Sequence, residues 1–352
     1  MPFARSGLSA TAAIAGLLLS HSAFAQASVA DIANYAKPDR QKMLEDGARR
    51  EGAVLIYTTG TTTQPIMDKF RARYPFIKLE VWRGDSVEVT RKTMEEYQAG
   101  RYDVDAFELS TAGLIPMRDT QILQPFATPE TASFIPEAIE PNRFWASTRV
   151  SYTGVGFNTK AVSREDAPKT YRDMLDPKWK SRMAISGSLG TAGNWVGAMV
   201  LADGVDYVRA LGRQNMRVYQ ASGRAVANLM ISGEVTISPN SYYDHVTSSK
   251  TEGAPLDWIA PGPVPVLDTA VAITSRAKHP HAAMLFVDFM IGREAQEMLG
   301  KLFYVSPRTD MPKGDLPEFK KLFLANRPNY IQEFEGWAKL LNEAFVSQAR
   351  QP

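Results

Sequence analysis

Four polar segments of this chain gather hydroxyl, glycine and amide groups and hold almost no carboxylates. They cover residues 57–63, 110–113, 186–194 and 238–243, and each follows a segment predicted to be a buried strand. Ligands of open α/β sheets bind beyond the carboxyl ends of the strands. The first three segments lead into predicted helices, whose free N–H groups attract anions. Together the segments favour an anion-accepting cleft, while ordinary N-capping by Ser, Thr and Asn is the alternative for any one of them.

The candidate ligand-binding groups are the hydroxyls and backbone N–H groups of these segments. The predicted set from the first three segments is Thr58, Thr59, Thr61, Ser110, Thr111, Ser186, Gly187, Ser188 and Thr191. A helix predicted to start at Asn194 would direct its N-terminus to the same anion. The segment at 187–193 is not a nucleotide motif, because it lacks the Lys of a P-loop and the spacing of a dinucleotide fingerprint.

Tyr242 and Tyr243 are the other pair of residues that could do chemistry. Adjacent tyrosines on a loop can give two phenolate oxygens to a hard trivalent metal, or two hydroxyls to an oxyanion. In the alternative interpretation, one ring packs in the core and the other lies at the surface. Both interpretations stay open at this point.

No catalytic constellation is visible in the sequence. Asp244 and His245 are adjacent, but neighbours on one chain rarely face each other productively, and the hydroxyls of the polar segments have no base beside them. The chain has no Cys, which excludes disulfides, Cys-ligated metal clusters and thiol catalysis. Lys and Arg number 40 against 38 Asp and Glu, and this balance argues against a nucleic acid partner.

The elements that must position these groups alternate along the first third of the chain. Helices are predicted at 39–51, 64–74 and 87–100, and strands at 53–57, 77–82 and 104–109. The alternation predicts a mostly parallel sheet covered by helices.

The rest of the chain repeats this pattern with shorter elements. Strands are predicted at 154–158, 183–185, 235–237 and 269–275, and helices at 171–175, 194–202, 225–232, 281–291, 318–325 and 330–347. The proline-rich passage at 255–265 reads as a crossover strand.

The first 25 residues have the layout of a secretory signal peptide. Arg5 precedes a short apolar run, and 23–25 read Ala-Phe-Ala, a small-x-small cleavage pattern. The run is too short to cross a bilayer, which needs about 20 residues. We therefore expect residues 26–352 to form an exported, periplasmic protein.

Six segments resemble the periplasmic solute-binding proteins of ABC importers, in the branch of the ferric-ion-binding proteins. They are residues 53–57, 74–79, 176–183, 233–235, 286–289 and 292–297. The resemblance implies an α/β fold of type 2 with two lobes joined by crossover strands, and a ligand cleft between the lobes. It predicts one lobe from 26–147 plus 266–310 and the other from 148–265 plus 311–352.

The resemblance also implies roles for single residues. The iron-ligating tyrosines of the family correspond to Tyr242 and Tyr243, its anion-holding turn to Ser186 and Gly187, and an Asn before the tyrosines to Asn240. The His of the family's first loop is replaced, and its Glu corresponds to Ser110. Tyr152 or Tyr57 could serve as a further ligand. The transported ligand is then either Fe³⁺ with a synergistic anion or a metal-free organic anion.

The resemblance further implies an ABC permease in the inner membrane as the partner of a monomeric binding protein. An exported α/β hydrolase or lyase acting on a small anion is the alternative function. It would need a nucleophile or a base in the polar segments, and the sequence shows only hydroxyls there.

Overall fold

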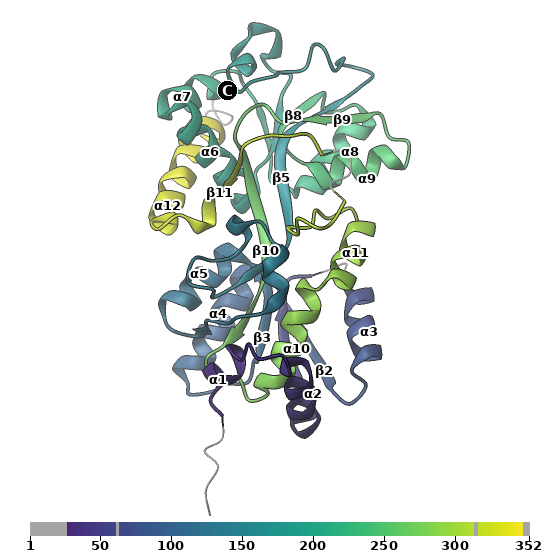
Figure 1. Cartoon of the computed structure of the whole chain (residues 1–352). Coiled ribbons are helices and arrows are strands. Elements are labelled where there is room, and N and C mark those ends of the chain that lie inside the picture. The colour runs from purple at the N-terminus through teal and green to yellow at the C-terminus, as the bar shows by residue number, and fades with distance from the viewer. Residues whose placement is uncertain (1–26, 61–62, 313–315, 348–352) are drawn as a thin grey trace, which may run out of the picture.

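The computed structural model describes residues 27–60, 63–312 and 316–347. The predicted signal peptide and Thr61 lie outside this range. Two lobes are stacked along two long strands, β5 (Ala146–Asn158) and β10 (Val264–Thr274), which run through both of them (Figure 1).

The N-terminal lobe is built around three parallel strands. β1 (Ala53–Thr58) pairs with β2 (Lys78–Arg83) on one side and with β3 (Ala106–Ser110) on the other. Helices cover both faces of this sheet, so that the apolar residues of each strand are buried on both sides. The helices of this lobe are α1 (Val29–Ala33), α2 (Arg40–Glu51), α3 (Gln64–Arg73), α4 (Ser86–Gln98), α5 (Thr111–Asp119), α10 (Pro280–Ile291) and α11 (Arg293–Lys301).

The large sheet is mixed: β1, β2 and β3 are parallel as predicted from the first third of the chain, but the prediction of a mostly parallel sheet is wrong for the sheet as a whole. Its main path runs β2-β1-β3-β10-β5-β8, with β8 at Ile237–Tyr242. β10 is antiparallel to both β3 and β5, and β5 is antiparallel to β8. The reason is the double crossing between the lobes: the chain leaves the N-terminal lobe on β5 and returns on β10, so the two strands run in opposite directions.

The C-terminal lobe holds β8, β9 (Leu256–Ile259) and a separate parallel pair, β6 (Ala184–Ser186) with β7 (Arg217–Tyr219). Its helices are α6 (Leu189–Asp203), α7 (Val205–Gly212), α8 (Gly223–Ser232), α9 (Tyr243–Thr251) and α12 (Tyr330–Leu341). The remaining elements are short: β4 (Leu123–Gln124), β11 (Lys321–Phe323), a π-helical turn at Asn342–Val346, and 3-10 turns at Pro129–Ser133, Pro136–Ala138, Arg172–Leu175, Pro177–Trp179 and Leu324–Asn326.

Helix α6 starts at Leu189 and not at Asn194, because the glycines of this segment are helical. An added Cβ at Gly193 would lie 2.7 Å from the Phe334 ring, and one at Gly197 would lie 2.4 Å from the Trp337 ring. The glycines therefore allow α12 to pack closely along α6. Their low helix propensity misled the sequence prediction.

Two further predictions are corrected by strand pairing. Residues 238–242, expected to form a loop, belong to β8 and pair with β5 around a bulge between Gly154 and Gly156. Residues 318–325, expected to be helical, instead contain β11, which pairs with the first residues of β10, and then enter a 3-10 turn. In both cases the partner strand lies far away in the sequence.

Candidate functional site

The carboxyl ends of β1 and β3 hold a buried polar cluster in the N-terminal lobe. The Thr58 hydroxyl donates a hydrogen bond to the fully buried Glu108 carboxylate. The N–H of Gly60 donates to Thr58 Oγ1 at 2.8 Å, and the N–H of Thr59 donates to the Glu108 carbonyl at 3.0 Å. The structure therefore places Thr58 and Thr59 beside a carboxylate that the sequence analysis did not single out.

Arg149 on β5 is paired with the Glu108 carboxylate through Nη1. Its guanidinium also lies over the Tyr304 ring, 4.9 Å from the ring centre. A guanidinium carries five N–H donors. Within the described ranges, no hydrogen bond of the Arg149 side chain other than the one to Glu108 is present. The side chain is 10 % exposed, so the guanidinium is nearly buried with N–H groups that have no acceptor among the described residues.

Ser151 and Thr153 follow Arg149 at the two-residue spacing of a strand face. The Thr153 hydroxyl and the Asp244 Oδ1 atom are buried, and neither has a hydrogen-bond partner in the part of the chain that the structure describes. Burial raises the pKa of Asp244 to about 6, against the opposing effects of Arg224, Ser151 and Arg149. These are polar atoms for which a bound ligand could supply the missing partner.

At the start of α6, some of the predicted binding groups are hydrogen-bonded within the protein and others are not. The Ser186 hydroxyl donates to the Ala221 carbonyl at 2.7 Å, and Asn240 exchanges two hydrogen bonds with the Ser186 backbone at 3.1 and 2.9 Å. The Gly187 N–H donates to the Tyr219 carbonyl at 2.7 Å. Ser186, Gly187 and Asn240 thus hold β6 in place. Ser188, the exposed N-cap, has no side-chain capping bond, and the first N–H groups of α6 have no partner within the helix.

The two adjacent tyrosines have different neighbours. The Tyr242 hydroxyl lies 2.7 Å from Thr191 Oγ1, and burial raises the pKa of this tyrosine to about 12. The Tyr243 ring packs against Trp258 with ring centres 5.3 Å apart. The difference arises because Tyr242 ends β8 and Tyr243 begins α9.

The other candidate tyrosines are engaged elsewhere. Tyr152 is buried with its ring 5.0 Å from Phe319, and burial raises its pKa above the ordinary value. The Tyr57 hydroxyl donates to Glu96 at 3.0 Å, within the core of the N-terminal lobe. The structure does not bring either hydroxyl to the polar groups around Arg149.

Ser110 and Thr111 mark the start of α5 and lie at a cavity between the lobes. Ser110 Oγ is 2.6 Å from Ser86 Oγ, and the Thr111 hydroxyl donates to Asp268 at 2.5 Å. The cavity has a volume of about 260 Å³. Its lining residues come from both lobes and from β10: Ser110, Thr111, Ala112, Gly190, Asn194, Val266, Leu267, Asp268, Ala325, Tyr330, Ile331 and Phe334.

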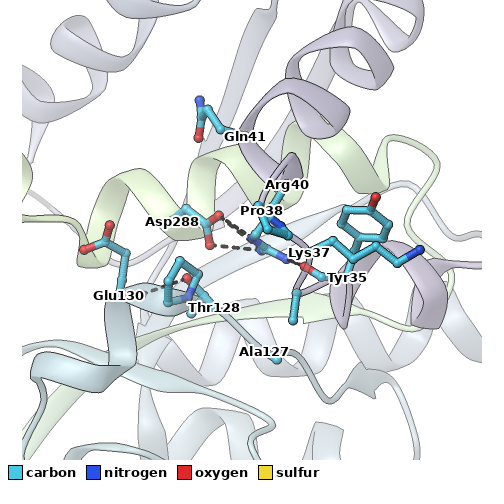
Figure 2. Close-up of a pocket in the computed structure, with 11 residues that line it drawn as sticks. Tyr35, Lys37, Pro38, Arg40, Gln41, Ala127, Thr128, Glu130 and Asp288 are labelled. Atoms are coloured by element: carbon cyan, nitrogen blue, oxygen red, sulfur yellow. Dashed lines mark hydrogen bonds and ion pairs between the residues drawn. The ribbon is translucent and has the colours of Figure 1, made fainter.

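A larger depression of about 550 Å³ lies on the N-terminal lobe, away from the polar groups described above (Figure 2). At its floor, Arg40 forms two hydrogen bonds to Asp288, at 3.1 and 3.2 Å, and a third to the Tyr35 carbonyl at 2.5 Å. Figure 2 shows the guanidinium turned toward these partners. This arrangement joins α2 to α10.

The described residues contain no group of three or more His, Cys, Asp and Glu side chains that could hold a metal ion. Any metal site would therefore depend on tyrosines or on a bound anion. None of the helices in the described ranges is long and apolar enough to span a membrane.

The profile of bacterial extracellular solute-binding proteins matches residues 116–329. The chain belongs to this family. Among curated proteins, it is similar to iron uptake protein A1 of Synechocystis, with 23 % identity over 248 residues that span 66 % of this chain and 68 % of the relative.

Solved structures with a similar fold hold different ligands. Iron-bound HitA from Pseudomonas aeruginosa matches with a TM-score of 0.68 and 18 % identity, covering 83 % of this chain and 99 % of HitA. AfuA from Actinobacillus pleuropneumoniae, with exogenous fructose-6-phosphate bound, matches with a TM-score of 0.69 and 21 % identity, covering 84 % and 99 %. These likenesses confirm the predicted type 2 binding-protein fold with two lobes.

Family membership also confirms the predicted class of function. The protein is a solute-binding protein of the ABC importer type, and the exported enzyme is not favoured. Sequence reasoning did not include Arg149 and Asp244 among the candidate binding residues. The alternation of polar residues at 149, 151 and 153 was the available signal for the first.

Proposed function

We propose that the mature protein is a periplasmic binding protein that captures a small anionic solute between its lobes and delivers it to an inner-membrane permease. The lobes are those predicted above, 26–147 plus 266–310 and 148–265 plus 311–352. The observation that carries the proposal is Arg149, a nearly buried guanidinium at the lobe boundary with donors left over after its pairing with Glu108.

The anion would be held from both sides of the boundary. Arg149 supplies charged donors from the crossover strand, and the first turn of α6 supplies backbone N–H groups and the Ser188 hydroxyl from the C-terminal lobe. A hydrogen bond to a charged group contributes about 1.5–3 kcal/mol. Two or three such bonds, with the helix N-terminus, are enough to account for selective binding of an anion.

Ferric iron with a synergistic anion is the second candidate, because Tyr242 and Tyr243 are both present. Relatives that bind or take up iron support it. A ferric ion needs anionic oxygen ligands to offset its charge. Glu108 is already paired with Arg149, and Tyr242 shares a hydrogen bond with Thr191. Because these oxygen ligands are already bonded within the protein, binding of an anion by Arg149 is favoured over binding of a ferric ion.

The proposal extends to the oligomeric state, the processing and the partners of the protein. We infer that it works as a monomer after removal of residues 1–25 and that it has no nucleic acid partner. The nearly balanced charge of the chain supports the second point.

The test is to purify the protein without added ligand and measure its metal and phosphorus content, then its thermal stability with phosphate, phosphonate and carboxylate anions. We expect little iron and an anion-dependent rise in melting temperature. Small-angle scattering should show a smaller radius of gyration with the stabilising anion. Stoichiometric iron, with no stabilisation by any anion alone, would overturn the anion proposal.

A further inference from the structure

The cavity between α5, α6 and α12, here called the side chamber, is apolar over most of its wall. Six of its lining residues are apolar side chains: Ala112, Val266, Leu267, Ala325, Ile331 and Phe334. Its five polar residues are bonded within the protein: Thr111 to Asp268, Tyr330 to Asn194, and Ser110 to Ser86. A chamber of this character suits a hydrocarbon group better than a hydrated ion.

Helix α12 leaves apolar surface uncovered where it borders the side chamber. Ile331 is 40 % exposed and Phe334 is half-buried, whereas Trp337 one turn further on is buried against Gly197 of α6. The same helix thus packs tightly at one end and is open at the other. The open end faces the boundary between the lobes (Figure 1).

The side chamber shares the first turn of α6 with the candidate anion site. Gly190 lines it from the first turn of α6, and Thr191, the next residue, is bonded to Tyr242. Ser110 and Thr111 bring the N-terminus of α5 to the opposite wall. A solute whose charged group is held near these helix starts would have its remaining atoms beside the chamber.

The volume limits what the chamber can hold. A dry apolar cavity of about 150 Å³ is known to bind benzene, and small-molecule pockets span roughly 300–1,000 Å³. The side chamber, at about 260 Å³, has room for one ring or a short branched chain. It is larger than a simple inorganic anion requires.

We propose that the solute is an organic anion with an apolar substituent of up to one aromatic ring, and that the side chamber binds this substituent. The inference rests on the proposed function, since it assumes that the charged group is bound between the lobes. It adds the chemical class of the solute and assigns the chamber to it.

The experiment compares matched pairs of probes by calorimetry: methylphosphonate with phenylphosphonate, and acetate with benzoate. The surface of one phenyl ring, about 100 Å², corresponds to roughly seventyfold in affinity at the usual transfer value. Allowing for ordering costs, we expect the aryl member of at least one pair to bind about tenfold more tightly or better. Equal affinities within both pairs would overturn the chamber assignment and leave the anion proposal standing.

Ala112→Leu fills the chamber from α5 with a good helix former. It should remove the preference for the aryl probe and leave binding of the methyl probe within about twofold. Ala99→Leu, the same change at an exposed position just past α4, is the control and should retain the preference. An aryl preference that survives Ala112→Leu would place the ring elsewhere. If none of the four probes binds at millimolar concentration, the anion proposal fails and the chamber assignment fails with it.

Discussion

The guanidinium of Arg149 is paired with the carboxylate of Glu108 across strand β10, which separates their two strands in the sheet. Glu108 belongs to β3 in the N-terminal lobe, and Arg149 belongs to β5, which continues into the C-terminal lobe. The pair therefore ties the crossover strand to the first lobe. It also holds a cationic group, with donors to spare, at the boundary where the solute is proposed to bind.

Replacing Arg149 by Gln should weaken anion binding about ten- to a hundredfold, as expected for the loss of one charge-assisted hydrogen bond. The change leaves Glu108 buried without its counter-charge, so stability should also fall, on the order of 3 kcal/mol. Calorimetry measures the first effect and denaturant unfolding the second.

The double variant Arg149→Gln with Glu108→Gln separates the two effects. It removes both charges, so stability should recover much of the loss while anion affinity stays low. Arg91→Gln, which changes an exposed arginine paired with Glu95 on α4, is the control for binding. If the double variant binds the anion as tightly as the wild type, Arg149 is not the counter-charge.

Supplying ferric citrate or ferric phosphate to the wild-type protein should leave it colourless. The two tyrosines have separate neighbours, Thr191 for Tyr242 and Trp258 for Tyr243, and burial raises the pKa of Tyr242 to about 12, which opposes formation of its phenolate. Visible absorption measures the phenolate-to-iron charge transfer. A coloured wild type that is bleached by Tyr242→Phe with Tyr243→Phe would establish iron as the ligand in place of the metal-free anion.

The first lobe could be predicted from the sequence because its elements are local. Strand, helix and turn signals between 39 and 110 alternate with clear apolar periodicity, and the structure follows them within a few residues. Of the two strands that cross the lobe boundary, only parts were predicted: 269–275 for β10 and 154–158 for β5. Residues 146–153 of β5 include Ser147, Thr148, Arg149 and Ser151, whose polar side chains serve the boundary and interrupt the apolar pattern.

The site was predicted in part for a related reason. Hydroxyl-rich segments that follow strands can be recognised from the sequence alone, so Thr58, Ser110 and Thr191 could be named as candidate binding residues. Arg149 and Asp244 could not be named, because the groups that contact them lie far away in the sequence. Glu108, for example, precedes Arg149 by 41 residues. The sequence also could not show that Ser186 and Asn240 are engaged with the backbone and with each other.

Asp244 and His245 should give the protein opposite pH dependences that nearly cancel. Burial raises the pKa of Asp244 from 3.8 to about 6, so its native state holds a proton that the unfolded chain releases, and stability falls as pH rises through this window. Burial, with Arg224 nearby, lowers the pKa of His245 from 6.5 to about 4, so stability rises with pH over nearly the same window.

Single variants should expose each contribution. Relative to the wild type, Asp244→Asn should gain stability as pH rises from about 4 to 6, and His245→Gln should lose it as pH rises from about 4 to 6.5, each by on the order of 3 kcal/mol. Denaturant unfolding at a series of pH values measures both. Glu252→Gln, at an exposed carboxylate just past the end of α9, is the control. Parallel curves for all the variants would contradict the assignment.

Asp288→Ala should destabilise the protein without changing its affinity for the anionic solute. Asp288 and Arg40 have side chains only 15 % and 7 % exposed, and burial raises the pKa of Asp288 although Arg40 opposes the rise. Removing the carboxylate leaves Arg40 buried without its counter-charge, which typically costs about 3–5 kcal/mol. Unfolding by denaturant should show this loss, whereas Asp46→Ala, which breaks an exposed pair with Lys42 on the same helix, should leave the midpoint close to that of the wild type. Anion affinity should be unchanged in both variants, because the depression in Figure 2 lies outside the proposed site. A folded Asp288→Ala protein that no longer binds the anion would move the solute site to that depression.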